Sequence, residues 1–295
     1  MAEGSKPPKQ ALPGGLYLVA TPIGNAGDIT LRALDVIARA DVLACEDTRV
    51  SAKLLAAHAI RRTLISYHDH NAASMRPVIL EHLRNGDSVA LISDAGTPLV
   101  SDPGYKLVRQ CREEGLDVTT VPGASSVLSA LQLSALPSDR FLFVGFLPPK
   151  QAARRHALED IKDIKATLVI MESAKRLPKM LGDAAHVLGE REACVTREMT
   201  KLFEEARSES LHNLADFYTQ NGPPKGEVVV VVEGARAKDA PSDEALDALL
   251  GDALRDHTLR DAVDEVAHRT GVARKRVYRR ALALPRETAS PTDDA

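Results

Sequence analysis

The stretch at residues 93–104, SDAGTPLVSDPG, decides how the first part of this chain folds. It follows the apolar run 89–92 and precedes a helical pattern that begins near Tyr105. Glycine supplies backbone conformations closed to other residues, proline presets φ, and Asp and Ser hydrogen-bond to nearby backbone. In α/β proteins, ligands bind where a strand ends in such a turn and continues into a helix. The alternative is a tight, well-capped connection that binds nothing.

Short apolar runs alternate with longer amphipathic runs on both sides of this turn. Strands are predicted at residues 16–20, 42–45, 64–66, 89–92 and 118–121, with a helix at 31–39. The pattern resumes with strands at 141–145, 167–171, 193–196 and 227–232 and helices at 152–164, 174–188 and 211–220. Such alternation predicts a mostly parallel sheet covered by helices on both faces. The run EVVVVVEG at 227–234 is typical of a strand buried on both faces.

The last part of the chain has a different pattern. Three helices are predicted at residues 244–255, 259–269 and 275–284, with Thr258 as an N-cap and Gly271 as a break. The final helix carries a dense set of cations: Arg274, Lys275, Arg276, Arg279, Arg280 and, just beyond it, Arg286. This outline resembles a helix-turn-helix and predicts contacts with RNA phosphates. The alternative is a basic face that only keeps a small helical bundle soluble.

These patterns predict an α/β protein built from two α/β domains and a small C-terminal helical module. The expected boundaries are a flexible leader at residues 1–13, an N-terminal α/β domain at 14–136, a second α/β domain at 137–238, the helical module at 243–286 and a disordered tail at 287–295.

Composition excludes several classes of protein. A hydrophobic content of 44% and a charged content of 27% are ordinary for a globular protein, and a net charge of −3 argues against a surface that binds nucleic acid all over. The three cysteines lie far apart, so we expect reduced, buried thiols rather than disulfides or a Cys-based zinc site. The N-terminus lacks the apolar core of a signal peptide, so we expect a cytoplasmic protein.

Three turns share one setting at the ends of predicted strands: TPIGNAGD at residues 21–28, the stretch at 93–104, and PGASS at 122–126. In a parallel sheet they would gather at the carboxyl edge around one crevice. Neither a phosphate-binding G-x-x-x-x-G-K-[ST] loop nor a G-x-G-x-x-G fingerprint is present. The central turn carries no basic residue, which favours a neutral or cationic ligand. S-adenosylmethionine, with its sulfonium cation, meets that requirement.

Seven motifs occur in the order known from one family. They are TPIGNAGDITLRA, CEDTR, SDAGTPLVSDPG, VPGASS, ESAKRL, TREMTK and KGEVVVVVEG, and they span roughly residues 14 to 235. Together they resemble the small-subunit ribosomal RNA methyltransferase I family of the tetrapyrrole methylase superfamily. The resemblance implies 2′-O-methylation of a decoding-centre cytidine in 16S ribosomal RNA, with S-adenosylmethionine bound between two α/β domains. A homodimer is implied by the superfamily alone.

The resemblance also implies which residues bind the cofactor. The matching positions are Thr21, Pro22, Asp94, Ala95, Gly96, Thr97, Ser125, Ser126, Met171, Glu172, Met199 and Thr200. The first turn departs from the glycine-rich form of the porphyrin enzymes, which favours an RNA substrate over a flat macrocycle.

Activating a ribose hydroxyl needs a base or a cation near the forming alkoxide. The candidates are Glu172, Glu198 and Lys201 from the second domain and Glu46, Asp47 and Arg49 from the first. Each could equally be part of a solvated face or a structural ion pair. The loop YHDHN at residues 67–71 could offer two histidines and an aspartate to zinc, but nothing completes the set. We expect no metal, and a polar loop that faces the substrate; the alternative is an exposed loop without a role.

Two other functions stay open at this point. A methylase acting on a small tetrapyrrole precursor would have no use for the basic module. A non-catalytic RNA-binding protein on the same fold would not need intact glycine-rich turns.

Overall fold

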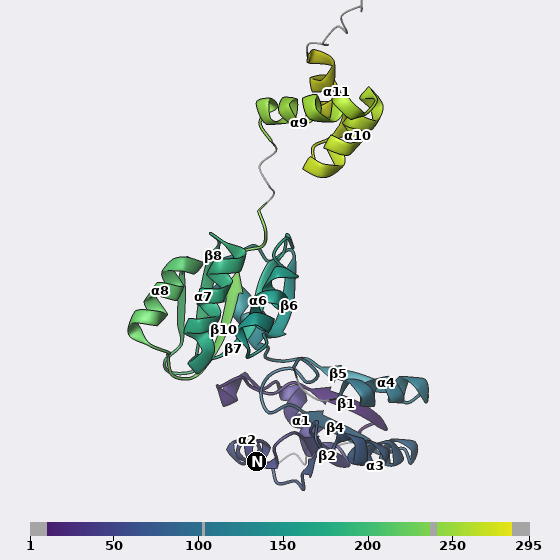
Figure 1. Ribbon diagram of the computed structural model, residues 1–295. Coiled ribbons are helices and arrows are strands. Elements are labelled where there is room, and N and C mark those ends of the chain that lie inside the picture. Colours follow the sequence, from purple (N-terminus) through teal and green to yellow (C-terminus); the bar gives the residue numbers. More distant parts are fainter. Residues whose placement is uncertain (1–10, 102–103, 237–240, 285–295) are drawn as a thin grey trace, which may run out of the picture. The chain divides into compact units, whose positions relative to one another are not determined.

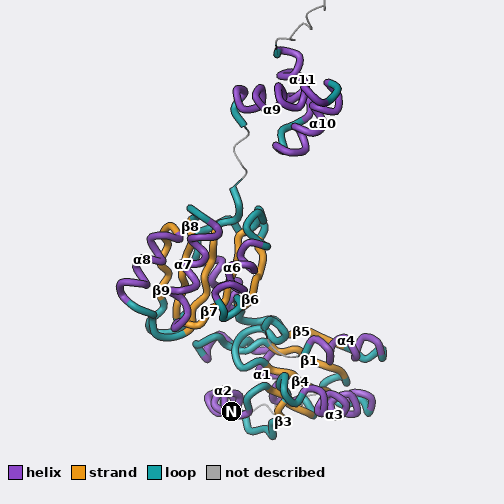
Figure 2. Tube along the Cα trace, in the orientation of Figure 1, coloured by secondary structure: helices purple, strands orange, loops and turns teal. Residues whose placement is uncertain are grey.

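The computed structural model describes residues 11–101, 104–236 and 241–284, so the predicted leader, tail and Arg286 fall largely or wholly outside it. The chain divides into two compact units, Met1–Ala235 and Arg236–Ala295 (Figure 1). The larger unit contains two five-stranded sheets with helices against them, and the smaller unit is helical (Figure 2). The fold class is therefore as predicted, while the finer domain boundaries stay predictions.

The first sheet has the doubly wound arrangement that the alternating pattern predicts. Its strands are β1 (Gly15–Val19), β2 (Val42–Cys45), β3 (Ile65–Ser66), β4 (Ser88–Ile92) and β5 (Val118–Val121), and all neighbours are parallel in the order β3-β2-β4-β1-β5. Because these strands are parallel, the carboxyl ends of β1, β2 and β4 meet at one edge of the sheet.

Helices cover both faces of this sheet. Apolar side chains of α1 (Leu31–Arg39) and α2 (Thr48–Ala57) pack with Val19 and Ile92 on one face. Those of α3 (Ala72–Arg84) and α4 (Tyr105–Glu113) pack with Leu16 and Leu91 on the other. Thr30 caps α1 by accepting a hydrogen bond from the Ala33 N–H, which fixes where this helix begins.

The second sheet is mixed rather than parallel. It contains β6 (Phe141–Phe146), β7 (Thr167–Ser173), β8 (Glu192–Arg197), β9 (Glu205–Ser210) and β10 (Glu227–Val232) in the order β6-β7-β10-β8-β9. Only β6 and β7 are parallel; β10 runs antiparallel to both of its neighbours, and β8 and β9 form a hairpin. The run of valines in β10 is buried along its length, as its sequence predicts.

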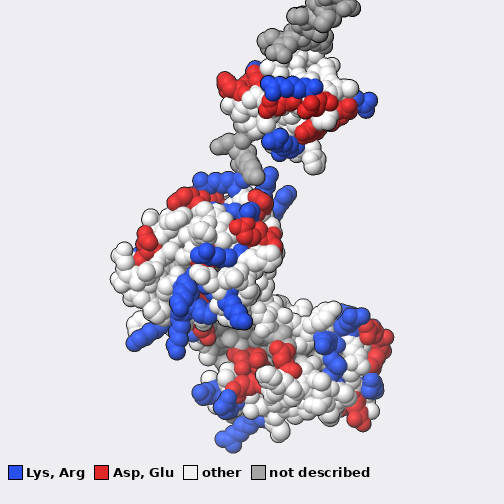
Figure 3. All heavy atoms as spheres, viewed as in Figure 1, with Lys and Arg blue, Asp and Glu red and all other residues white. Residues whose placement is uncertain are grey.

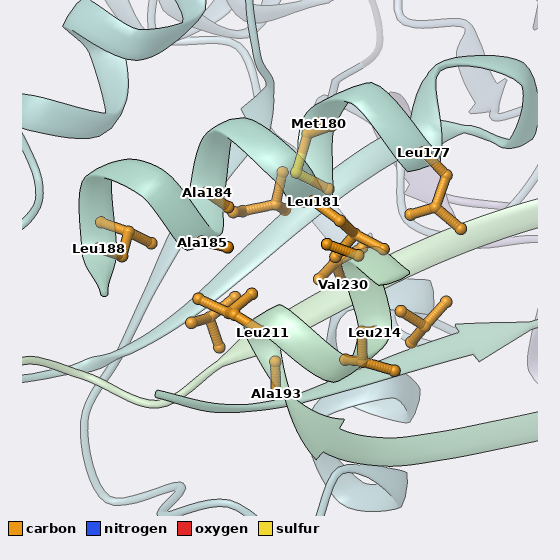
Figure 4. Close-up of a cluster of buried hydrophobic side chains, with 14 of the residues drawn as sticks. Leu177, Met180, Leu181, Ala184, Ala185, Leu188, Ala193, Leu211, Leu214 and Val230 are labelled. Atoms are coloured by element: carbon orange, nitrogen blue, oxygen red, sulfur yellow. The ribbon is translucent and has the colours of Figure 1, made fainter. Parts of the chain in front are cut away.

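Three helices cover one face of the second sheet. They are α6 (Gln151–Glu159), α7 (Leu177–Leu188) and α8 (Leu211–Asn221). Leu181, Leu211 and Val230 meet in the buried apolar cluster drawn in Figure 4. The predicted helix at 152–164 ends earlier than expected, because residues after 159 form tight turns closed by i to i−3 hydrogen bonds.

The opposite face of the second sheet is covered by a helix from the first half of the unit. Val127, Ala130 and Leu131 of α5 (Ser126–Leu133) pack against Val169 of β7 and Val231 of β10. Met199 and Ile23 join the same apolar cluster. The two sheets of this unit are thus joined through a shared core, next to the turn that leads into α5.

The C-terminal unit is a three-helix bundle of α9 (Asp243–Asp256), α10 (Leu259–Thr270) and α11 (Arg274–Ala283). Thr258 caps α10 by accepting from the Asp261 N–H, and Gly271 ends it in the left-handed conformation, both as predicted. Leu246, Val263 and Val277 fill its core. Among the described residues, no helix is long and apolar enough to cross a membrane.

The cluster in Figure 4 predicts a clear effect on stability. Leu181→Ala should lower the free energy of unfolding by about 2–5 kcal/mol, because the substitution removes buried methyl groups and leaves a cavity. Urea unfolding followed by circular dichroism would measure it. Leu31→Ala, at a side chain that is 87% exposed, is the control and should change stability by no more than about 0.5 kcal/mol. Equal losses in both variants would contradict this account of the core.

Candidate functional site

Hydrogen bonds tie the three predicted turns together. The backbones of Thr21 and Gly96 form a two-way bridge, with N···O distances of 2.9 and 3.1 Å. The Thr21 hydroxyl donates to the Ser93 carbonyl at 2.9 Å, and the Thr97 hydroxyl donates to the Ala124 carbonyl at 3.1 Å. The predicted gathering of these turns at one sheet edge is confirmed.

A cavity of about 460 Å³ lies beside these hydrogen-bonded turns, and its volume is within the range of small-molecule sites. Five of the predicted cofactor residues line it: Ala95, Ser126, Met171, Glu172 and Met199. Backbone and side chains from both halves of the unit contribute, including Ile23 and Ser101 from the first and Phe146, Ser173, Gly226 and Val229 from the second. The walls are mainly apolar, with a few polar groups among them.

The hairpin turn between β8 and β9 brings Met199 to this cavity. Glu198 and Thr200, on either side of it, have positive φ angles of 49° and 66°, a strained conformation for residues with a side chain. Two hydrogen bonds support it: the Asn25 N–H, from the turn after β1, donates to the Thr200 hydroxyl at 3.1 Å, and within the turn the Thr200 N–H donates to the Glu204 carboxylate at 2.6 Å. Strain that is fixed from several sides is typical of functional turns.

Glycine is required where this turn meets its neighbours. Gly226 has a φ of +96°, and a Cβ there would collide with the Glu198 carboxylate. A Cβ on Gly24 would lie 2.6 Å from the Lys201 side chain. The two glycines therefore let the Glu198 and Lys201 side chains lie directly against the backbone of adjacent turns.

The predicted catalytic carboxylates are held by cations. Glu172 is fully buried and forms an ion pair with Arg176 at 2.8 Å, while its Oε1 also accepts from the Ser173 N–H at 2.7 Å. Lys201 Nζ lies 3.0 Å from Glu198 and 3.1 Å from Glu227.

These pairs also determine the charge state of Glu198 and Lys201. The Lys201 hydrogen bond and the Glu227 backbone N–H lower the pKa of Glu198. Burial would lower the pKa of Lys201, but the two carboxylates outweigh it and raise that pKa. Glu198 is therefore a weak base at neutral pH, and Lys201 keeps its proton.

A second cavity, of about 400 Å³, lies at the ends of β2, β3 and β4. Its lining joins the predicted EDTR motif, the histidine loop and one residue of the central turn: Glu46, Asp47, Thr48, Arg49, Ser66, His68, His70 and Asp94. Nearly every lining group is polar. The sequence predicted these motifs separately, and the structure shows that they form one site.

Local hydrogen bonds shape this second cavity. Asp47 caps α2 by accepting from the Arg49 N–H at 2.8 Å, and hydrogen bonds from Arg49 lower the pKa of Asp47 to about 2. The Asn71 side chain accepts from the His68 N–H at 2.8 Å and donates to the Ser66 carbonyl at 3.0 Å, which fixes the histidine loop. In the part of the chain that the structure describes, no three metal-ligating side chains converge.

Asp94 does not line the cavity expected for the cofactor but faces the second one. Its Oδ1 accepts a hydrogen bond from the Asp47 N–H at 3.0 Å. Burial, together with the charge of Asp47, raises the pKa of Asp94 despite that hydrogen bond. Asp94 and Ala95 are neighbours on one turn, and each lines a different cavity.

The remaining predicted cofactor residues shape the turns instead of lining the first cavity. Thr21, Gly96 and Thr97 hold the turns together, and Ser125 caps α5 by accepting from the Leu128 N–H. Pro22 is buried beside them, and Thr200 supports the β8–β9 turn. Sequence reasoning missed Ile23, Ser101 and Phe146, although Ile23 and Ser101 lie inside motifs that it had marked. Phe146 carried no signal beyond its place at the end of a strand.

The basic residues of α11 are extensively paired within their own unit. Arg274 pairs with Asp264, Arg276 with Asp243 at 2.8 Å, and Arg280 with Asp243 and Asp247. Residues 241–284 contain eight Lys and Arg and eight Asp and Glu, so their net charge is zero. Lys275 and Arg279 are the members of the predicted cluster for which no ion pair is found among the described residues.

The first cavity fits S-adenosylmethionine on chemical grounds. Among the described residues, Glu172 and Glu227 line this cavity and no Lys or Arg does, which suits a cation and not a phosphate. Met171, Met199 and Val229 offer apolar surface to an aromatic base, and Ser126 offers a polar contact.

Comparison with known proteins agrees with this chemistry. A family profile described as "Tetrapyrrole (Corrin/Porphyrin) Methylases" matches residues 15–215, and one described as "RsmI C-terminal HTH domain" matches residues 239–285. The larger unit is also similar to a Thermus thermophilus uroporphyrin-III C-methyltransferase in complex with S-adenyl homocysteine, with a TM-score of 0.52 and 20% identity over 75% of this chain and 97% of that one. At that identity the likeness concerns the fold alone.

Relatives at higher identity define the family. The chain is 50% identical to the ribosomal RNA small subunit methyltransferase I of Mesorhizobium japonicum, over 94% of both proteins. It is 42% identical to the protein of the same name from Escherichia coli O157:H7, over 91% of this chain and 95% of that one. Because these matches extend through both compact units, the chain belongs to the ribosomal RNA small subunit methyltransferase I family.

Proposed function

We propose that this enzyme transfers a methyl group from S-adenosylmethionine to the ribose 2′-hydroxyl of a decoding-centre cytidine in the 16S RNA of the small ribosomal subunit. The observation that carries the proposal is the turn that contributes Ala95 to one cavity and Asp94 to another. A group-transfer enzyme needs a donor site and an acceptor site next to each other, and one rigid turn with a residue in each meets that need.

The cavity of about 460 Å³ is the proposed donor site. S-adenosylmethionine supplies an electrophilic methyl group on a positively charged sulfur. The carboxylates of Glu172 and Glu227 favour that charge, while Met171 and Met199 give the adenosyl part apolar contacts. We assign Glu172 a positioning role, because Arg176 and the Ser173 N–H hold its carboxylate in one orientation.

The second cavity is the proposed acceptor site. Its polar lining suits a nucleotide, whose base, ribose and phosphate all form hydrogen bonds. Arg49 and the histidine loop supply donors there, and Asp94 is the carboxylate that we propose as general base for the 2′-hydroxyl. A raised pKa makes Asp94 a stronger base than Glu198 or Asp47, whose pKa values are lowered.

The two alternative functions have less support. A tetrapyrrole-precursor methylase would need a broad apolar acceptor site, whereas the second cavity is polar. A non-catalytic RNA-binding protein would not need a strained, fully supported turn at Met199 beside a sizeable cavity.

The proposed substrate places the enzyme in the cytoplasm, where ribosomal subunits are assembled. We also propose a homodimer, which would cover the exposed apolar side chains Leu202 and Phe203 on the β8–β9 turn.

Filling part of the donor cavity should weaken cofactor binding. Ala95 is exposed and lines the cavity, so Ala95→Leu should fold normally and raise the Kd for S-adenosylmethionine at least about tenfold, which corresponds to about 1.4 kcal/mol. Isothermal titration calorimetry would measure it. Ala38→Leu, at an exposed position of α1, is the matched control and should bind like the parent. Equal affinity in both variants would place the cofactor elsewhere.

Asp94→Asn should separate chemistry from cofactor binding. We expect an unchanged Kd for S-adenosylmethionine and a kcat lowered by about 10²–10⁴-fold, the usual contribution of general base catalysis. Because a base acts in its deprotonated form, the activity of the unsubstituted enzyme should fall as the pH drops through the raised pKa of Asp94. The activity of the variant should not show this dependence on pH. Incorporation of labelled methyl into subunits that lack the modification would measure both. A large loss of affinity for S-adenosylmethionine would indicate that Asp94 binds the cofactor and does not act as the base.

Removing the C-terminal unit tests its proposed role in RNA binding. A chain ending at Ala235 should keep its affinity for S-adenosylmethionine, because the donor cavity lies wholly in the larger unit. Its KM for the ribosomal subunit should rise, by about tenfold if Lys275, Arg279 and the paired arginines Arg274, Arg276 and Arg280 contact phosphates. Undiminished methylation would show that the unit has another purpose.

A further inference from the structure

A cluster of positive charge lies on the first part of α6, the first part of α7 and the segments that lead into them. Residues 147–158 and 173–182 contain six Lys and Arg and no acidic residue. We call the side chains of Lys150, Arg154, Arg155, Lys175, Arg176 and Lys179 the basic ledge. Figure 3 shows Lys and Arg gathered over this part of the larger unit, with few acidic side chains among them.

One buried carboxylate organises the centre of the ledge. Asp183 is 2% exposed and pairs with Arg154 at 2.6 Å and with Arg155 at 2.7 Å. Gln151 donates to the same carboxylate at 3.1 Å. Burial alone would raise the pKa of Asp183, but these hydrogen bonds lower it, so the group stays ionised. A single negative charge therefore holds two guanidinium groups, and one positive charge remains.

Three lysines add to that excess. Lys150, Lys175 and Lys179 are exposed, and no ion pair is found for them among the described residues. Among the described residues, the ion pairs of the six ledge cations involve two carboxylates, Glu172 and Asp183, which leaves four positive charges without a counter-charge in these pairs. Lys179, Arg154 and Arg155 line a cavity of about 600 Å³, so part of this charge surrounds a concave surface.

The ledge borders the proposed donor site. Ser173 and Ala174 line the donor cavity, and Lys175 follows them directly in the chain. Phe146 lines it as well, and Arg176 links the two segments by donating to the Leu147 carbonyl at 2.7 Å while pairing with Glu172. A polyanion on the ledge would therefore lie next to the reacting groups.

We propose that the basic ledge binds the phosphate backbone of the RNA on either side of the methylated nucleotide. The proposal rests on the proposed function, because it assumes an RNA acceptor. Lys and Arg contacts with phosphate fix the register of a nucleic acid without reading its sequence. Such contacts would bring the 2′-hydroxyl to the acceptor cavity by holding its neighbours.

The ledge is less suited to other partners. No large exposed apolar side chain lies on α6 or α7. Membrane insertion and stable protein interfaces both use apolar anchors, so their absence from these two helices favours a polyanion. Residues 241–284 of the C-terminal unit offer no comparable excess, since they have no net charge.

The test uses the full chain with Lys175→Ala and Lys179→Ala combined. Lys106→Ala with Lys165→Ala is the matched control, because it removes the same charge at exposed positions outside the ledge. The Kd for a 16S decoding-centre RNA fragment is measured between 50 and 200 mM salt. We expect the ledge variant to bind about tenfold more weakly and its salt slope to fall by about 1.5, as two lost phosphate contacts require.

Kinetics on small ribosomal subunits give a second readout. Phosphate contacts that position the substrate should raise KM and leave kcat within about twofold, while the Kd for S-adenosylmethionine stays unchanged. Parental RNA affinity and salt slope in the ledge variant would overturn the proposal. So would an effect confined to whole subunits, which would indicate a protein contact. Failure of the parent enzyme to methylate subunits would refute the proposed function, and the RNA titration would still decide whether the ledge binds RNA.

Discussion

The backbone bridge between Thr21 and Gly96 is the constraint on which the site depends. It joins the ends of β1 and β4, and Gly96 can form it because it adopts a φ of +81° with Ile23 packed against it. A side chain at Gly96 would be strained there and would press on Ile23, which is part of the core shared by the two sheets. A glycine at position 96 is therefore needed for the bridge at the sheet edge and for the position of Ile23, which lines the cavity and packs against α5.

Charge pairing divides the acidic residues of the site by role. Glu172 and Glu198 each lie against a cation and a backbone N–H, so both carboxylates are held in one orientation. Asp94 accepts a hydrogen bond from the Asp47 N–H, but burial and the negative charge of Asp47 raise its pKa. We therefore propose that Glu172 and Glu198, which the motifs mark most strongly, position other groups. The carboxylate that we propose for proton transfer, Asp94, lies inside the turn expected to bind the cofactor.

Hydrophobic patterning predicted most of the fold, because burial on both faces gives strands such as β4 and β10 continuous apolar sequences. It could not predict β9, whose sequence EARSES has no apolar periodicity and forms a strand through pairing with β8. Ala95, Met171 and Met199, which the motifs marked for cofactor binding, all line the cavity that we propose as the donor site. The sequence could not predict which cavity Asp94 lines, because this depends on the direction of its side chain. That direction is fixed by the hydrogen bond that Asp94 accepts from the Asp47 N–H, and Asp47 lies far from Asp94 in the sequence.

Basic sequence and basic surface differ in this protein, and the difference has a physical cause. The arginines of α11 form ion pairs with aspartates of α9 and α10, which lie elsewhere in the sequence. Counting the cations along α11 therefore overstates the positive charge that this helix presents to a ligand. In the basic ledge, the arginines form ion pairs with two buried carboxylates, which hold the guanidinium groups in place. These carboxylates do not neutralise the charge of the lysines. Since long-range attraction of a polyanion depends on the charge that remains after pairing, the ledge should dominate the attraction of RNA to the described surface. The paired arginines of α11 would have to exchange an aspartate for a phosphate in order to contact RNA. Such an exchange would contribute more to the orientation and register of the RNA than to its affinity.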